Sequence, residues 1–160
     1  MPIGSSAYQL ATKDVYCANW YETFMAQVLT AAAKEPETGK VTQAEAEAML
    51  RAAFKLFERW NVSPAQARVL LGQPSSSTFY RWKRGHVGSL PPDRVWRLGD
   101  LMGIHKALRH MFTDPERGYA WISQPNAAFG GKSALDRMLT GAPSDLTAIR
   151  NYLDAERGGW

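Results

Sequence analysis

Apolar positions along the chain recur at helical spacing, and no stretch alternates convincingly between apolar and polar residues. Within residues 13–33, large side chains repeat at every fourth position as Tyr16, Trp20, Phe24 and Val28. We expect a helix here, with its stripe buried against the same chain or a partner. The pattern as a whole predicts an all-α protein.

Capping residues mark where the next two helices begin. Thr42 with Glu45, and Ser63 with Gln66, follow the S/T-x-x-E/Q pattern of a capping box. The apolar face behind the first of these caps consists of Met49, Leu50, Ala53, Phe54, Phe57 and Trp60. Both segments are therefore predicted to be amphipathic helices with defined starts.

The helix that begins after Ser63 is short and stops before Gly72, a favoured residue type just past a helix end. Gln73-Pro74 completes a tight connection, and Ser75 is placed to cap a third helix that runs to Arg84. Two short helices joined by such a glycine-containing turn predict a helix-turn-helix.

The remaining helices are shorter or interrupted. We expect Gly103 to break one helical segment into two, and residues 124–132 to form a loop. The predicted helices span residues 90–102, 104–112, 114–123 and 133–141, with a last one capped by Ser144.

The third predicted helix separates polar and aromatic residues on a helical wheel. Its outward arc holds Ser76, Ser77, Tyr80, Arg81 and Arg84, with Lys83 at the edge. Thr78, Phe79 and Trp82 fall on the opposite side, where they would pack on the preceding helices. We therefore expect this helix to present hydroxyl, phenol and guanidinium groups to a partner.

Those groups are the ones that read a DNA major groove. Arginine can bond guanine O6 and N7 together, and serine can donate or accept. Gln66 and Ser75, at the starts of the two helices, are placed for phosphates, and Arg68, Lys83 and Arg94 could add charge. The alternative is an ordinary amphipathic helix with a solvated polar face. For Tyr80 alone, a second alternative is that its ring packs sideways instead of reading bases.

Charge is distributed unevenly along the chain. Residues 51–112 hold eleven Lys or Arg and three Asp or Glu, a balance of +8, whereas the rest of the chain has a balance of −4. A basic middle between acidic flanks favours a polyanionic partner for one segment only. A basic surface that only aids solubility is the alternative interpretation.

Several classes of function find no support in the sequence. The single cysteine, Cys17, allows neither a disulfide framework nor a cysteine-based zinc site. No signal pattern opens the chain, and no apolar run reaches the roughly 18 residues that cross a bilayer, so we expect a cytoplasmic protein that does not contact a membrane. We expect no metal, no cofactor and no catalytic site, because His105 and His110 do not share a helical face and no nucleophile has a partner base.

Gly130-Gly131-Lys132-Ser133 is similar to the end of a phosphate-binding loop. The first glycine of that motif should stand at position 126, which is Asn126, and a strand should precede the loop. A nucleotide-binding protein or enzyme would need Lys132 and Ser133 to hold phosphate.

Three stretches resemble the MbcA/ParS/Xre antitoxin family. Residues 63–85, SPAQARVLLGQPSSSTFYRWKRG, resemble its Xre-like helix-turn-helix, and residues 101–112 resemble its connecting helix. Residues 112–158 resemble its toxin-binding domain through a W-[LI]-x-x-P-N-x-x-[LF]-G-G run that includes Trp121, Asn126, Phe129, Gly130 and Gly131. The family usually has Thr-Pro where this chain has Ser133-Ala134, and the helix at 13–33 has no clear counterpart.

The resemblance implies a type II antitoxin that pairs with a RES-domain toxin, an NAD-consuming enzyme. It would cover the entrance to the toxin's active site and, as a homodimer on an inverted repeat of operator DNA, repress its own promoter. Trp121, Asn126, Phe129 and the two glycines would contact the toxin, and the tail from Arg157 to Trp160 would plug its cleft or else be a frayed terminus.

The implied organisation has three parts: an N-terminal arm with one helix at 1–40, the DNA-binding domain at 41–112 and the toxin-binding domain at 113–160. The alternative function is a stand-alone helix-turn-helix regulator whose C-terminal domain dimerises.

Overall fold

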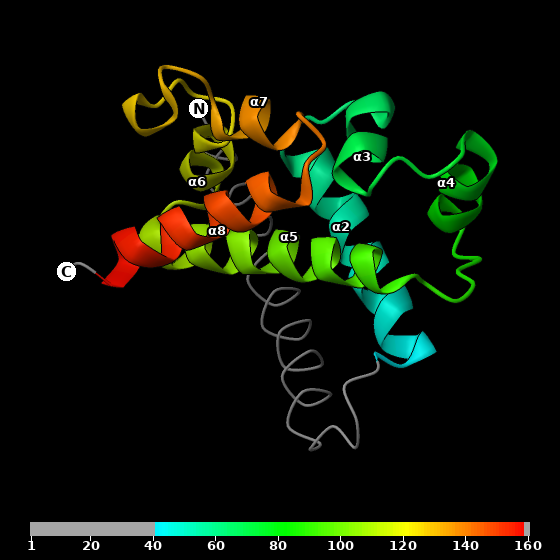
Figure 1. Ribbon diagram of the computed structural model, residues 1–160. Coiled ribbons are helices and arrows are strands. Elements are labelled where there is room, and N and C mark those ends of the chain that lie inside the picture. Colours follow the sequence, from blue (N-terminus) through cyan, green and yellow to red (C-terminus); the bar gives the residue numbers. More distant parts are fainter. Residues whose placement is uncertain (1–40, 159–160) are drawn as a thin grey trace, which may run out of the picture. The chain divides into compact units, whose positions relative to one another are not determined.

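The computed structural model describes residues 41–158, which belong to one compact unit (Figure 1). The helix predicted at 13–33 and the end of the tail at Trp160 lie outside the described residues. Within 41–158 every regular element is a helix, and the one β-bridge pairs Pro125 with Ser133. The all-α prediction is confirmed.

Helices α2 to α5 form the first half of the described chain. Their bounds are α2 Gln43–Arg59, α3 Pro64–Leu70, α4 Ser76–Lys83 and α5 Pro92–Met111. The capping boxes predicted at Thr42 and Ser63 are both present. The order of a long helix, two short ones and a long closing helix is that of a helix-turn-helix domain.

The second half contains shorter elements. Their bounds are α6 Pro115–Trp121, the 3-10 turn η1 Ala127–Phe129, α7 Ala134–Met138 and α8 Pro143–Gly158. Ser133 caps α7 in a capping box with Asp136, as the sequence predicts. The prediction that Ser144 caps the last helix was wrong, because α8 begins at Pro143 and Ser144 lies inside it.

The predicted break at Gly103 was also wrong, because α5 continues through it without interruption. A Cβ placed on Gly103 would lie 2.6 Å from Nε of Arg150, a residue of α8. The glycine therefore serves the close approach of a side chain from α8, and the burial of both flanking turns of α5 compensates for its weak helix propensity.

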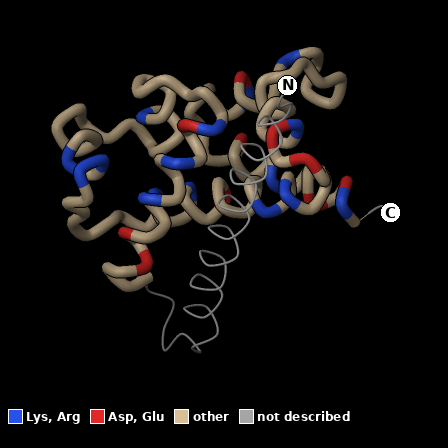
Figure 2. Tube along the Cα trace, turned by 180° about the vertical axis from the view of Figure 1, so that it is seen from behind, with Lys and Arg blue, Asp and Glu red and all other residues tan. Residues whose placement is uncertain are grey.

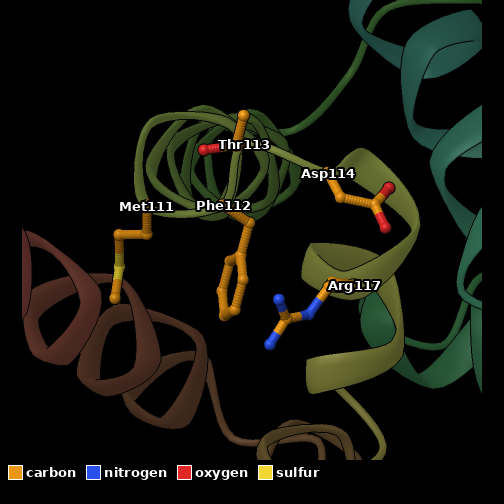
Figure 3. A pocket seen from close by; sticks show the side chains of 5 residues that line it. All are labelled: Met111, Phe112, Thr113, Asp114 and Arg117. Atoms are coloured by element: carbon orange, nitrogen blue, oxygen red, sulfur yellow. The ribbon is translucent and has the colours of Figure 1, made fainter.

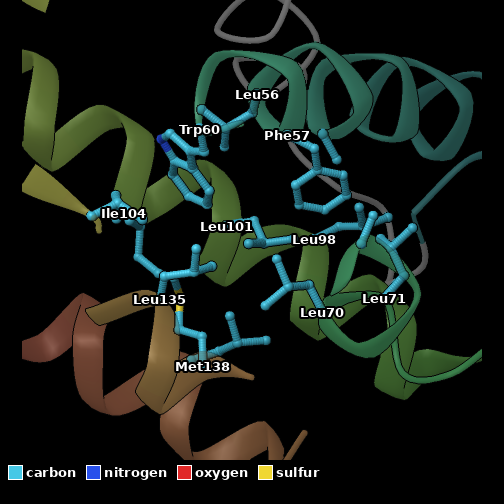
Figure 4. Packing of buried hydrophobic residues seen from close by; sticks show 14 of the residues in the cluster. Leu56, Phe57, Trp60, Leu70, Leu71, Leu98, Leu101, Ile104, Leu135 and Met138 are labelled. Carbon is cyan, nitrogen blue, oxygen red and sulfur yellow. The ribbon is translucent and has the colours of Figure 1, made fainter. Parts of the chain in front are cut away.

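One hydrophobic core runs through both halves. α5 packs against α2, α6 and α8, and α8 also packs against α7. Figure 4 shows Trp60, just after α2, together with Ile104 of α5 and Leu135 and Met138 of α7 in the same cluster. Since helices on both sides of residue 112 share this cluster, the domain boundary proposed there stays a prediction.

Candidate nucleic-acid and toxin interfaces

The turn between α3 and α4 is fixed by its backbone. Gly72 and Gln73 both adopt left-handed conformations, with φ of +80° and +54°. The Gln73 amide donates to the Arg68 carbonyl at 2.7 Å, and Nε of Arg68 donates to the Pro74 carbonyl at 3.0 Å. These bonds set the direction in which α4 leaves the turn.

The start of α4 is held by side-chain capping. The Ser75 hydroxyl oxygen accepts from the Thr78 amide at 3.2 Å and donates to the Thr78 hydroxyl at 2.9 Å. The side chain of Gln66 has a similar task at α3, where its oxygen accepts from the Ser63 amide at 2.9 Å. Gln66 and Ser75 thus stand at the helix starts, but their oxygens already serve as caps.

Buried aromatic rings anchor α4 from beneath, as the helical wheel predicts. Phe79 and Trp82 are 2% and 4% exposed. The Phe79 ring meets that of Phe54 from α2 edge-on, with centroids 5.4 Å apart. Only one orientation of α4 about its axis satisfies these contacts, so the opposite face must point to solvent.

The exposed face of α4 carries the predicted polar groups. Ser76, Ser77, Tyr80, Arg81, Lys83 and Arg84 are all exposed. Among residues 41–158, no ion pair joins Arg81, Lys83 or Arg84 to an acid. Figure 2 shows only Lys and Arg as charged residues on this helix, so its face is positively charged. The Tyr80 ring also packs edge-on against Phe79 at 5.3 Å.

In the second half, three aromatic rings form a half-buried cluster. Trp121 of α6 stacks on Tyr152 of α8, with centroids 6.2 Å apart and planes 9° apart. Phe129 of η1 meets both rings edge-on, at 6.3 and 5.0 Å. We call these three residues the aromatic cluster. It joins the loop after α6 to α8 and leaves apolar surface open to a partner.

The loop around the glycine pair is closed by its own backbone. Gly130 and Gly131 are left-handed, with φ of +67° and +81°. The Gly130 amide donates to the Ala127 carbonyl, and the Gly131 amide donates to the Asn126 carbonyl, each at 3.0 Å. The Asn126 side chain completes the loop by accepting from the Ala128 amide at 2.9 Å. Both glycine amides are thus engaged within the loop instead of pointing at a ligand.

Sequence reasoning missed two residues of this surface. Tyr152 contributes its ring to the aromatic cluster, and its hydroxyl lies 3.5 Å from Nδ2 of Asn126. Arg137 places its guanidinium 5.8 Å from the Phe129 ring centroid and bonds Asp145 at 3.2 Å. Tyr152 borders the apolar face of the last helix and could have been found as its flank, whereas Arg137 offered no signal.

The tail residue Arg157 is exposed and pairs with Asp154 at 3.4 Å.

A separate pocket of about 470 Å³ opens where α5 meets α6, lined by Met111, Phe112, Thr113, Asp114 and Arg117. Figure 3 shows the Phe112 ring and the Arg117 guanidinium turned toward each other there. No pattern in the amino-acid sequence indicates this pocket.

A buried arginine connects the two halves. Arg97 of α5 is 7% exposed, and its Nη2 donates to the Gly141 carbonyl, just before α8, at 2.7 Å. On its other side, a Cβ on Gly72 would lie 3.1 Å from its Nε. Burial lowers the pKa of Arg97. The side chain of Arg97 thus contacts both the turn before α4, at Gly72, and the loop before α8, at Gly141.

The described part of the chain has neither a membrane-spanning helix nor a cluster of metal-ligating side chains. No helix within 41–158 has the length and apolar character to cross a membrane. The same residues contain no group of three or more His, Cys, Asp or Glu side chains arranged to hold a metal ion.

Comparisons with known proteins agree with both halves of this arrangement. Residues 40–105 match the antitoxin Xre-like helix-turn-helix domain, and residues 107–159 match the antitoxin Xre/MbcA/ParS C-terminal toxin-binding domain. A relative from Sinorhizobium fredii (strain NBRC 101917 / NGR234), described as uncharacterized protein y4oB, is 47% identical over 116 residues, which cover 72% of this chain and 89% of the relative. No solved structure matches the chain significantly. With its DNA-binding and toxin-binding domains both matched, the chain belongs to the Xre/MbcA/ParS family and is an antitoxin of a toxin–antitoxin system.

Proposed function

We propose that this antitoxin represses its own operon by reading operator DNA through α4. The observation that carries this proposal is the exposed face of α4, where Arg81 and Arg84 project from a helix anchored by Phe79 and Trp82 and pair with no acid among residues 41–158. Guanidinium groups held in this way can bond guanine edges, and Lys83 adds a phosphate contact. As a homodimer, the protein would read two half-sites of an inverted repeat.

We further propose that the toxin is of the RES type and that the aromatic cluster contacts it. The support is the half-buried apolar surface of Trp121, Phe129 and Tyr152, together with the family's own toxin-binding domain. Aromatic side chains of this kind supply much of the binding energy in protein interfaces. The antitoxin would block the toxin by covering its entrance, with the tail from Arg157 as an additional plug.

The DNA half of the proposal is tested with the fragment directly upstream of the chain's own gene. Arg81→Ala and Arg84→Ala should each weaken binding by about 1–3 kcal/mol, and more for the operator than for unrelated DNA. Arg51→Ala is the matched control, because Arg51 is also exposed but lies on α2. Equal losses for Arg51→Ala and Arg81→Ala would reject α4 as the reading element.

The toxin half is tested by expressing the chain together with the protein of the neighbouring gene and following cellular NAD. Phe129→Glu places a charge in the aromatic cluster and should abolish protection of NAD and of growth. The same variant should still bind the upstream fragment, which shows that it is folded. NAD that stays protected in this variant would reject the surface, and a toxin that leaves NAD untouched would reject the RES assignment.

A further inference from the structure

The pocket between α5 and α6 lies in the part of the chain that matches the toxin-binding domain, residues 107–159. Its apolar wall consists of the half-buried ring of Phe112 and the side chain of Met111. The ring is fixed in place by α6, because a Cβ placed on Gly118 would lie 3.3 Å from Cδ2 of Phe112. The pocket therefore has one rigid apolar wall.

Of the two charged residues that line the pocket, only one points into it. Figure 3 shows the Arg117 guanidinium turned toward the Phe112 ring, whereas the Asp114 carboxylate points away from that ring. Oδ1 of Asp114 accepts from the Glu116 amide at 3.0 Å and so caps α6. Arg117 is exposed and forms no ion pair or side-chain hydrogen bond with another residue of 41–158. Its guanidinium is therefore available to a partner.

The pocket adjoins the aromatic cluster along α6. Arg117 and Trp121 are four positions apart on this helix, so they share a face and their Cβ atoms lie about 5–6 Å apart. Trp121 in turn stacks on Tyr152 of α8. A protein that covers the aromatic cluster and extends toward the start of α6 therefore meets Arg117 next.

The other charges of these elements determine which kind of partner the surface suits. Lys132, which follows the glycine pair, is exposed and pairs with no acid among residues 41–158. Asp136 is engaged in the cap of α7, and Asp154 is paired with two arginines of α8. Glu156, near the end of α8, is exposed and pairs with no cation in the same range. With Arg117, the unpaired charge is positive on balance, which suits an acidic partner.

We propose that this pocket receives an acidic side chain of the toxin, whose carboxylate bonds the Arg117 guanidinium while its methylene carbons pack on Phe112. This inference rests on the toxin contact proposed above for the aromatic cluster. The fork of an arginine can bind both oxygens of a carboxylate, and a pocket of about 470 Å³ admits a side chain with the turn that carries it. Because docking covers Arg117, a toxin without this acid would leave the guanidinium buried and unpaired. Arg117 thus selects the cognate partner.

The experiment measures the affinity of full-length variants for the purified protein of the neighbouring gene. Arg117→Ala should weaken binding about 30-fold or more, the usual loss when one partner of a covered charge pair is removed. Arg117→Glu should weaken it further, because two carboxylates then meet, and Arg117→Lys should recover part of the loss, since lysine keeps the charge without the planar fork. Arg51→Ala removes the same charge from α2 and should bind like wild type. The urea midpoints of all these variants should match that of wild type.

Phe129→Glu, measured beside these variants, separates this inference from the proposal on which it rests. Loss of binding in Phe129→Glu with full binding in Arg117→Ala would overturn the pocket contact alone. An Arg117→Glu variant that binds as tightly as wild type would exclude an acidic occupant.

Two results would place the partner of Arg117 within this chain and so overturn the inference. One is a lowered urea midpoint in Arg117→Ala with toxin binding unchanged. The other is a loss of binding in Glu156→Gln equal to that in Arg117→Ala, which would mean that these two residues pair with each other. Wild type that does not bind the neighbouring protein would refute the toxin contact itself and this inference with it.

Discussion

Replacing Gly72 with alanine tests whether the turn of the helix-turn-helix rests on Arg97. Gly72 has a φ of +80°, and a Cβ there would lie 3.1 Å from Nε and 3.3 Å from Cδ of Arg97. Arg97 is 7% exposed and is tied to the Gly141 carbonyl at 2.7 Å. The arginine cannot swing into solvent without giving up that bond, so the added methyl group should displace it from Gly141.

Two contributions set the size of the effect. An alanine in the left-handed region is disfavoured by about 1–2 kcal/mol. Loss of a hydrogen bond from a charged donor adds about 1.5–3 kcal/mol. Gly72→Ala should therefore lower the free energy of unfolding by about 2.5–5 kcal/mol. Gly85→Ala is the matched control, because Gly85 has a φ of +88° but nothing within 4 Å of its Cβ position. Gly85→Ala should therefore lower the free energy of unfolding only by the backbone contribution.

Urea unfolding of both full-length variants, followed by circular dichroism, gives the two free energies. The restriction of the unfolded chain by alanine is the same at both positions and cancels in the comparison. A difference of about 1.5–3 kcal/mol is expected, and it should shrink when Arg97→Met is present in both backgrounds. Equal losses at Gly72 and Gly85 would refute the claim that Arg97 is fixed beneath the turn.

Two further predictions concern α5. Burial, with a smaller contribution from a nearby arginine, lowers the pKa of His105 to about 4; because the unfolded state then binds the proton more readily, stability should fall by about 3 kcal/mol as the pH drops from about 6.5 to 4. His105→Phe, which keeps the stack on Tyr119, should remove this part of the pH dependence. Wild-type urea midpoints that stay the same across this pH range would contradict the prediction. Gly99→Ala should stabilise the helix by up to about 1 kcal/mol, while Gly103→Ala should gain nothing, because its methyl group displaces Arg150; equal gains in thermal unfolding would argue against that contact.

Features encoded within a few residues could be predicted from the sequence. The caps at Thr42, Ser63 and Ser133 each depend on two side chains three positions apart, and all three are present. The burial of Phe79 and Trp82 follows from helical spacing alone. These predictions succeed because the interacting groups are close in sequence, so no knowledge of the tertiary fold is needed.

Contacts between distant segments were beyond such reasoning. From sequence alone, Gly103 was predicted to break the helix. Its actual role could not be predicted, because it depends on the side chain of Arg150, which reaches α5 from α8. The family resemblance led to Trp121 and Phe129, but the stacking of Tyr152 on Trp121 joins α6 to α8 and has no local signature. By contrast, the exposure of the polar side chains on α4 follows from helical spacing within one element.

The core that both halves share determines which experiments can separate the two activities proposed for this antitoxin. Removing residues 114–160 would take Met138 and Ile149 out of the cluster that contains Leu101 and Ile104 of α5, and would remove the Gly141 carbonyl from Arg97. Such a deletion should unfold or loosen the helix-turn-helix along with the toxin-binding surface, so a loss of DNA binding in it would say nothing about α4. Substitutions at exposed positions leave the core intact. For that reason Arg81→Ala on one side and Phe129→Glu on the other are the changes that can assign each activity to its own surface.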